Sequence, residues 1–128
     1  MWKKTFMLAT ERLLQIEKQF GSLVHHLVPV ELDDETLRLI IYLDDGTNLR
    51  VTEQWQGDAL RRYSYYWLTA DDELEIGWDN APHHVQLENF PHHKHIGNHS
   101  NLQPSYETCL EDVMTVILSG QDKAREGM

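Results

Sequence analysis

The stretch LRLIIYLDDGTNLRVTEQW, residues 37–55, decides the fold. The odd-numbered residues from 37 to 43 are all leucine or isoleucine, which is the period-two pattern of a half-buried strand. Asp45-Gly46 is a strong signal for a two-residue hairpin turn, and Thr47–Trp55 reads as the partner strand. The sequence therefore predicts an antiparallel hairpin at this point of the chain.

Further strands are predicted on both sides of this hairpin, separated by short turns. The strands are expected at about Leu23–Leu32, Leu60–Leu68 and Glu73–Trp78, with turns at Gln56-Gly57-Asp58 and Asp71-Asp72. Turns as short as these connect antiparallel strands without a crossover helix. We therefore expect an antiparallel β-meander of about five strands.

Two amphipathic helices are predicted to flank the meander. The first runs from about Thr5 to Gln19 and is stopped by Gly21. The second has Pro104 in its first turn and is ended by Gly120, so that residues 121–128 form a frayed tail. The apolar stripes, at steps of three and four, are Phe6, Ala9, Leu13, Ile16 and Phe20, and then Tyr106, Cys109, Leu110, Val113 and Ile117. The expected fold is a single α+β domain over residues 1–128.

Composition narrows the classes of function. The formal net charge of −10 argues against broad, sequence-independent binding of nucleic acid, although it leaves room for a small cationic site or a basic partner. The single cysteine, Cys109, excludes a disulfide within the chain and fits a reducing compartment. Its apolar neighbours favour inert packing over nucleophilic chemistry.

The chain shows no sign of a membrane segment. No apolar run approaches the roughly 18 residues that a span needs. Glu11 and Arg12 interrupt the apolar stretch that follows Lys3 and Lys4, so the N-terminus lacks the apolar region of a secretory signal. We expect a cytoplasmic protein without a membrane partner.

A long segment, Asp79–Gln103, carries few strand or helix signals and is expected to be a loop before the last helix. Six of the eight histidines lie in it, between His83 and His99. Histidine exchanges protons near neutral pH and binds transition metals. A functional site is therefore predicted here, although a polar loop can also carry solvated imidazoles.

Prolines sharpen this prediction, because Pro82 and Pro91 are each followed by two histidines. Proline restricts the residue before it, which suggests that the paired imidazoles are positioned. In an extended segment His93 and His95 would point the same way and could hold one metal or one phosphate. No zinc-ribbon or His-Glu-x-x-His pattern is present, so no bound cofactor is expected, and a divalent metal at the histidine loop is the weaker alternative.

Two residues at the start of the loop, Asp79 and Asn80, have two possible roles. Both residue types bond their own backbone readily, which is turn chemistry. An aspartate beside imidazoles could also fix a tautomer or raise a histidine pKa.

The strands carry two further features. Glu53 falls on the apolar face of its strand and needs a partner there, for which Arg61 on the neighbouring strand is the favoured candidate. Tyr63, Tyr65 and Trp67 share one face, which indicates core or cross-strand packing, with base stacking as the alternative. Ile76 and Trp78 are expected in the core.

Three motifs together resemble the TumE-type toxin family of bacterial toxin–antitoxin pairs. They are RYSYYW at Arg62–Trp67, WDNAPHH at Trp78–His84 and FPHHKH at Phe90–His95. The resemblance covers roughly Leu37–Leu118 and is most specific over Tyr63–Gly97. The positions that match the family pattern are Asp79, Asn80, Pro82, His83, His84, Pro91, His92, His93 and His95.

The resemblance implies a small growth inhibitor that acts on RNA and is neutralised by a helix-turn-helix antitoxin. The chain departs from the family pattern at two positions. Gly77 stands where family members often carry arginine, and Tyr66 stands where many have histidine. If that arginine steadies a phosphate, either this protein is a weakened family member, or Lys94 or a protonated histidine holds the phosphate instead.

The first functional hypothesis is a metal-independent endoribonuclease with a bell-shaped pH–rate profile, in which two imidazoles act as base and acid. One would come from the first pair and one from the second group, with Lys94 stabilising the phosphorane. The catalytic candidates are His83, His84, His92, His93, His95 and Asp79, and the substrate-binding candidates are Lys94, Asn80, Tyr65 and Arg61.

Two other classes stay open. The chain could be a binding module that docks on a protein or a metal without turnover. It could also be a structural protein in which the histidine loop caps the sheet and closes a homodimer.

Overall fold

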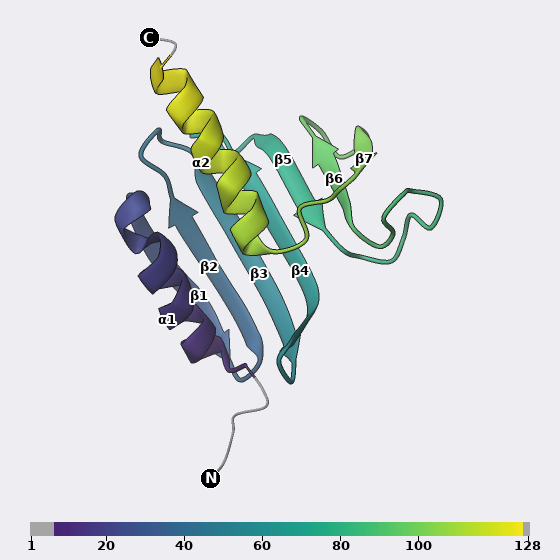
Figure 1. Ribbon diagram of the computed structural model, residues 1–128, viewed down its shortest axis with the longest axis horizontal. Coiled ribbons are helices and arrows are strands. Elements are labelled where there is room, and N and C mark those ends of the chain that lie inside the picture. Colours follow the sequence, from purple (N-terminus) through teal and green to yellow (C-terminus); the bar gives the residue numbers. More distant parts are fainter. Residues whose placement is uncertain (1–6, 127–128) are drawn as a thin grey trace.

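The computed structural model, which describes residues 7–126, contains seven strands that form one antiparallel sheet in chain order (Figure 1). The strands are β1 (His26–Asp33), β2 (Thr36–Tyr42), β3 (Asn48–Gln56), β4 (Ala59–Leu68), β5 (Leu74–Asp79), β6 (His93–Ile96) and β7 (Leu102–Pro104). Helix α1 (Ala9–Phe20) and a 3₁₀ turn (Gly21–Leu23) precede the sheet, and helix α2 (Leu110–Glu126) follows it. The predicted α+β class is confirmed, whereas the prediction of five strands is wrong.

The two unpredicted strands, β6 and β7, lie inside the segment expected to be a loop. β6 pairs with β5 from Ile76↔Ile96 to Asp79↔His93, and β7 pairs with β6. Neither strand shows a clear apolar alternation, because one face of β6 carries histidines. Pro104, expected in the last helix, ends the edge strand β7, where a missing N–H removes no ladder bond.

The central hairpin lies where it was predicted, but its loop is one residue longer than expected. Leu43 N–H donates to Thr47 O (3.0 Å) and Gly46 N–H donates to Leu43 O (3.1 Å), which leaves three residues in the loop. Gly46 has φ of +90°, a backbone conformation that glycine adopts without strain. This is a type I turn followed by a bulge, which is the next most common hairpin connection after two-residue turns.

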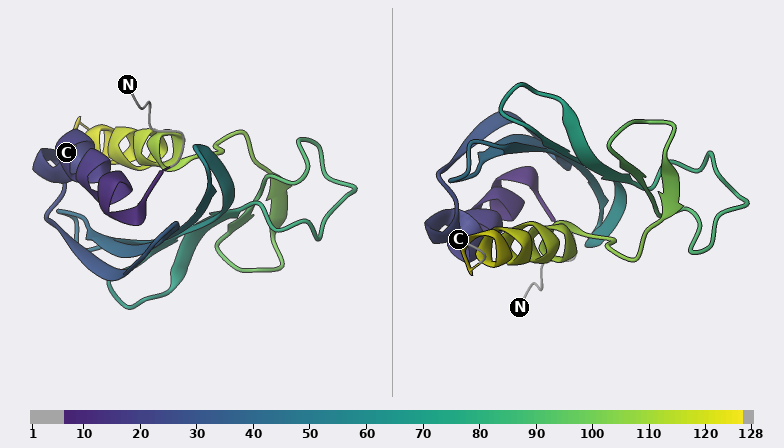
Figure 2. Two further views of the ribbon diagram at one scale, coloured as in Figure 1. Left: turned by 90° about the horizontal axis from the view of Figure 1, so that it is seen from below. Right: turned by 90° about the horizontal axis from the view of Figure 1, so that it is seen from above.

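Both helices lie on the same face of the sheet (Figure 2). Helix α1 begins at Ala9, where the backbone N–H bonds the carbonyl of Asp34 in the first hairpin turn (2.6 Å). The predicted start at Thr5 lies outside the described residues, as does Phe6 of the predicted stripe. The core between the helices and the sheet is formed by buried apolar residues, among them Ile16, Tyr65 and Trp78, and Ile76 packs against it.

Helix α2 differs from the prediction at both ends. It starts at Leu110 rather than near Pro104, and Asp112 accepts the N–H of Thr108 just before it (3.1 Å). It continues through Gly120 to Glu126, so the predicted end at Gly120 is wrong. A glycine costs a helix only about 1 kcal/mol relative to alanine, and most of the residues that follow are good helix formers.

The strand register assigns every residue of the sheet to one of two faces. One cross-strand row joins Leu39, Val51, Tyr65 and Trp78, all of which are buried beneath the helices. The neighbouring row joins Arg38, Thr52, Ser64, Asp79 and His93 on the opposite face. We call this second face the open face, because no helix covers it (Figure 2).

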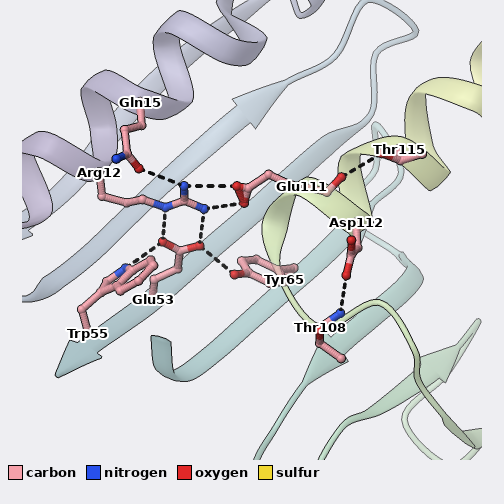
Figure 3. Close-up of polar contacts among 9 residues, drawn as sticks. All are labelled: Arg12, Gln15, Glu53, Trp55, Tyr65, Thr108, Glu111, Asp112 and Thr115. Atoms are coloured by element: carbon pink, nitrogen blue, oxygen red, sulfur yellow. Dashed lines mark hydrogen bonds and ion pairs between the residues drawn. The ribbon is translucent and has the colours of Figure 1, made fainter. Parts of the chain in front are cut away.

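A buried ion-pair network, formed by Arg12, Glu53 and Glu111, joins both helices to the sheet (Figure 3). Glu53 is 0 % exposed, and its two oxygens accept hydrogen bonds from Arg12 Nε (2.8 Å) and Nη2 (3.1 Å). Tyr65 and Trp55 donate the remaining bonds to this carboxylate (2.7 and 3.0 Å). Each buried charge is therefore satisfied.

The prediction that Arg61 pairs with Glu53 is wrong, because the partner is Arg12 of α1. Arg61 is exposed, whereas Arg12 lies directly over Glu53 in the layer between helix and sheet. Burial alone would lower the pKa of the Arg12 guanidinium, but hydrogen bonds and charges from Glu53 and Glu111 raise it above its usual value.

Candidate functional site

A cavity of about 610 Å³ opens on the open face of the sheet, beside the connection between β5 and β6. Thr52 and Ser64 lie along its floor in neighbouring strands, and exposed Arg62 of β4 also lines it. The other lining groups relevant to chemistry are Asp79, His83, His84, His93 and His95. A cavity of this size can hold a small organic ligand or part of a chain molecule.

Three of these side chains form what we call the Asp–His cluster, namely Asp79 of β5 and His93 and His95 of β6. Nε2 of His93 lies 2.9 Å from Asp79 Oδ1, and Nε2 of His95 lies 3.5 Å from Asp79 Oδ2. The exposed fractions are 8 % for Asp79, 3 % for His93 and 9 % for His95. The two histidines point the same way, as their spacing in an extended segment predicted.

Backbone carbonyls hold the other nitrogen of each ring. His93 Nδ1 lies 3.0 Å from the carbonyl oxygen of Pro91, and His95 Nδ1 lies 2.8 Å from that of His99. A carbonyl oxygen can only accept, so each Nδ1 carries a proton and donates it. Both rings are thereby fixed in orientation, with Nε2 directed at Asp79.

The first proline-anchored histidine pair reaches the same place. The His84 ring lies 5.0 Å from the His93 ring and 6.5 Å from the His95 ring, measured between centroids. His83 is more exposed and contacts His84 at 6.5 Å. Imidazoles from the two ends of the connection therefore converge, as the sequence predicted.

His92, also a catalytic candidate, lies against Tyr63 instead. Its Nδ1 is 2.8 Å from the Tyr63 hydroxyl, and the two rings stack. Burial and the neighbouring His93 lower the pKa of His92, while burial and the charge of Asp79 raise the pKa of Tyr63. Both groups are held neutral, which suits a packing contact at the base of the connection.

None of the four substrate-binding candidates from the sequence, Lys94, Asn80, Tyr65 and Arg61, lines the cavity. Lys94 alternates with the two cluster histidines, so it points to the helix side and pairs with Glu107 (3.1 Å). Tyr65 is fully buried on Glu53. Asn80 accepts the N–H of Tyr63 (2.9 Å) and donates to the carbonyl of Arg61 (3.0 Å), which ties the end of β5 to β4.

Sequence reasoning missed Arg62, Thr52 and Ser64 as site residues. A signal was present, because period-two alternation places Arg62, Ser64 and Tyr66 on the face opposite Tyr63 and Tyr65. Once the tyrosines are assigned to the core, the basic and hydroxyl side chains between them must face the open side.

The two departures from the family pattern, Gly77 and Tyr66, form one cross-strand pair. A Cβ atom at position 77 would overlap the Tyr66 ring, so the ring occupies the space beside the glycine backbone. The Tyr66 hydroxyl also donates a long hydrogen bond to Asp79 Oδ2 (3.4 Å). The tyrosine and the glycine are therefore mutually dependent in this chain.

Comparison with known proteins agrees with the resemblance. A family model described as Toxin TumE matches residues 15–120, which is most of the chain. The chain belongs to the TumE toxin family, and that family implies an antitoxin partner. No curated protein and no solved structure gives a match. Among the described residues, neither helix is long and apolar enough to cross a membrane.

Proposed function

We propose that this toxin is an endoribonuclease and that its active site is the cavity on the open face. The observation that supports this most directly is the convergence of His84 with the Asp–His cluster in a cavity lined by Arg62. Proton-transfer groups and a cation then lie together on an otherwise acidic protein. Phosphodiester cleavage needs such proton-transfer groups and a cation that stabilises the charged phosphorane.

The proposed reaction uses the 2′-hydroxyl of RNA as the nucleophile. The 2′-oxygen forms a bond to phosphorus while the bond from phosphorus to the 5′-oxygen breaks. A base takes the 2′-hydroxyl proton and an acid protonates the departing 5′-oxygen, giving a 2′,3′-cyclic phosphate and a 5′-hydroxyl. Histidines alone can supply both transfers, which is the metal-independent form of the reaction.

In this proposal His84 transfers one of the two protons, because it is the cluster's neighbour that is partly exposed. His83 also lines the cavity and is the candidate for the second proton transfer, while the Asp–His cluster lies at the floor of the cavity. Arg62 takes the place first expected for Lys94, because a guanidinium can hold phosphate oxygens with two hydrogen bonds. Thr52 and Ser64 offer hydroxyls to the sugar or phosphate.

The test is cleavage of a defined RNA by the purified protein. His84→Ala is expected to lower the rate by roughly 10²–10⁴-fold, the usual contribution of a general acid or base. His92→Gln is the matched control, because His92 lies in the same segment but contacts Tyr63, and its rate is expected to stay near that of the wild type.

A substrate with 2′-deoxyribose at the cleaved position adds a second control, because it lacks the nucleophile and must stay intact. Equal cleavage by wild type and His84→Ala would contradict the proposal. Growth inhibition that survives loss of the imidazoles, without RNA cleavage, would instead favour a toxin that acts only by binding.

We also propose that the antitoxin is a helix-turn-helix protein encoded next to this toxin. The net charge of −10 supports a partner with a basic surface. Co-expression should give a stable complex that elutes as one peak and suppresses RNA cleavage. An adjacent protein that neither binds nor protects would contradict this assignment.

A further inference from the structure

The geometry points to a metal site: we infer that Asp79, His93 and His95 bind a divalent first-row transition-metal ion. The three side chains offer one ligand atom each, all within 4.8 Å of one another, and all three are buried. Two imidazoles and one carboxylate, with the remaining positions open, form a ligand set that such ions occupy in enzymes.

The distances fit neighbouring ligands of one ion. Two ligand atoms that each lie about 2.1 Å from a metal, at octahedral or tetrahedral angles, are roughly 3.0–3.4 Å apart. His93 Nε2 lies 2.9 Å from Asp79 Oδ1, and His95 Nε2 lies 3.5 Å from Asp79 Oδ2, so each ring is near this spacing from one oxygen of the carboxylate. One ligand atom from each of the three residues lies within 4.8 Å of the others, so the side chains would draw together slightly around an ion.

The outer hydrogen bonds give a second, independent argument. Because each Nδ1 donates to a backbone carbonyl, a neutral ring turns the lone pair of Nε2 toward Asp79. A lone pair facing a carboxylate oxygen is unfavourable unless a cation lies between them. Metal-binding histidines almost always donate their other ring N–H to a carbonyl, a carboxylate or water in this way.

The open side of the cluster faces the cavity and His84, so a bound ion would be accessible to a substrate. The nitrogen ligands favour Zn²⁺, Mn²⁺, Fe²⁺, Co²⁺ or Ni²⁺ over Mg²⁺ and Ca²⁺, which prefer oxygen ligands. When bound, the ion would polarise a phosphoryl oxygen. This catalytic meaning rests on the proposed function, whereas metal binding can be tested without it.

The experiment uses the full chain, stripped with a chelator and then titrated separately with Zn²⁺, Mn²⁺ and Co²⁺. We expect one ion per chain by elemental analysis, and a Tm that rises with metal concentration because the ion binds only the folded state. With Co²⁺, visible bands should report nitrogen and oxygen ligands. The variants Asp79→Asn and His93→Gln should weaken binding by more than the roughly 10–100-fold that loss of an outer hydrogen bond causes.

Two controls separate this site from adventitious binding. His92→Gln changes the residue next to His93 without touching the cluster, and should bind metal like the wild type. His25 and His26 form a ring contact at 4.9 Å on another part of the chain, and their double change to alanine should also leave binding intact. Metal that stays bound to folded Asp79→Asn, or is lost with His25 and His26, would overturn the inference.

The outcomes also distinguish this inference from the proposed function. Chelated protein that takes up no metal in the titration but cleaves RNA at the full rate would reject the metal site and leave the endoribonuclease standing. Specific metal binding without any cleavage of RNA would retain the metal site and reject the endoribonuclease. Folding of each variant is checked by circular dichroism.

Discussion

The molecule contains two buried polar clusters that lie on opposite faces of one sheet. The buried ion-pair network sits between sheet and helices, and every charge in it meets an opposite charge or a hydrogen-bond donor (Figure 3). The Asp–His cluster also has each ring anchored, but its Nε2 atoms gather around one carboxylate beside a cavity. The buried ion-pair network is fully satisfied and stabilises the fold, whereas the Asp–His cluster still has ligand atoms that can bind an ion or a substrate.

The largest effect on stability is expected from disrupting the buried ion-pair network. Arg12→Ala leaves the carboxylate of Glu53 buried without a counter-charge, which should lower the free energy of unfolding by about 3–5 kcal/mol. Urea denaturation measures this. Lys18→Ala removes an exposed cation from the same helix and should change stability by less than about 0.5 kcal/mol. Similar values for the two variants would mean that the network is not structural.

The next largest effect on stability is expected at the Tyr66–Gly77 pair, which lies beside the Asp–His cluster. Gly77→Ala should destabilise the protein by about 1–3 kcal/mol, because the new Cβ overlaps the Tyr66 ring. In a Tyr66→Ala background the same change should be close to neutral, which a double-mutant cycle measures as coupling. Additive effects of the two changes would show that the Tyr66 ring is not the reason why position 77 requires glycine.

A smaller loss of stability is expected from a substitution in the Asp–His cluster itself. In the presence of chelator, Asp79→Asn should lower the free energy of unfolding by only about 1–2 kcal/mol, because asparagine keeps an oxygen and can donate to a neutral Nε2. Thermal or urea unfolding provides the value. A loss as large as that of Arg12→Ala would mean that the two clusters share a structural role.

The smallest expected effect is on the reactivity of the Cys109 thiol, which lies just before helix α2. Burial raises the pKa of the Cys109 thiol, so less thiolate is present at pH 8 than in a free cysteine. Alkylation of the native protein by iodoacetamide should therefore be slower than alkylation of the urea-unfolded chain. A faster native reaction would indicate an activated thiol and contradict the expectation of inert packing.

The same comparison explains how far the sequence could predict the fold. From β2 to β5 the strands bury apolar side chains on one face, and that period is visible in the residues around Leu39 and Val51. β6 was missed because three of its four residues, His93, Lys94 and His95, are polar, so it shows no apolar alternation. Arg12 was missed as the partner of Glu53 because it interrupts the apolar stripe of α1.

For the site, the sequence could predict that histidines from both ends of the segment come together, but not that His92 lies apart from them or which face they take. The prolines and the spacing of His93 and His95 indicated a positioned cluster, and the structure brings those rings to Asp79 and His84. Lys94 was assigned to the site as a cation that could replace the family's arginine, because Gly77 stands at that position. Once β6 is a strand, alternation places that side chain on the helix side, and the register of β4 brings Arg62 to the cavity.

The central claim is that the open face carries the active site, and RNA cleavage by folded Asp79→Asn tests it most directly. This change alters the Asp–His cluster and leaves the buried ion-pair network intact. The account predicts a native circular dichroism spectrum together with a rate at least about 100-fold below that of the wild type. A folded Asp79→Asn protein that cleaves RNA as fast as the wild type would contradict the assignment of the open face as the active site.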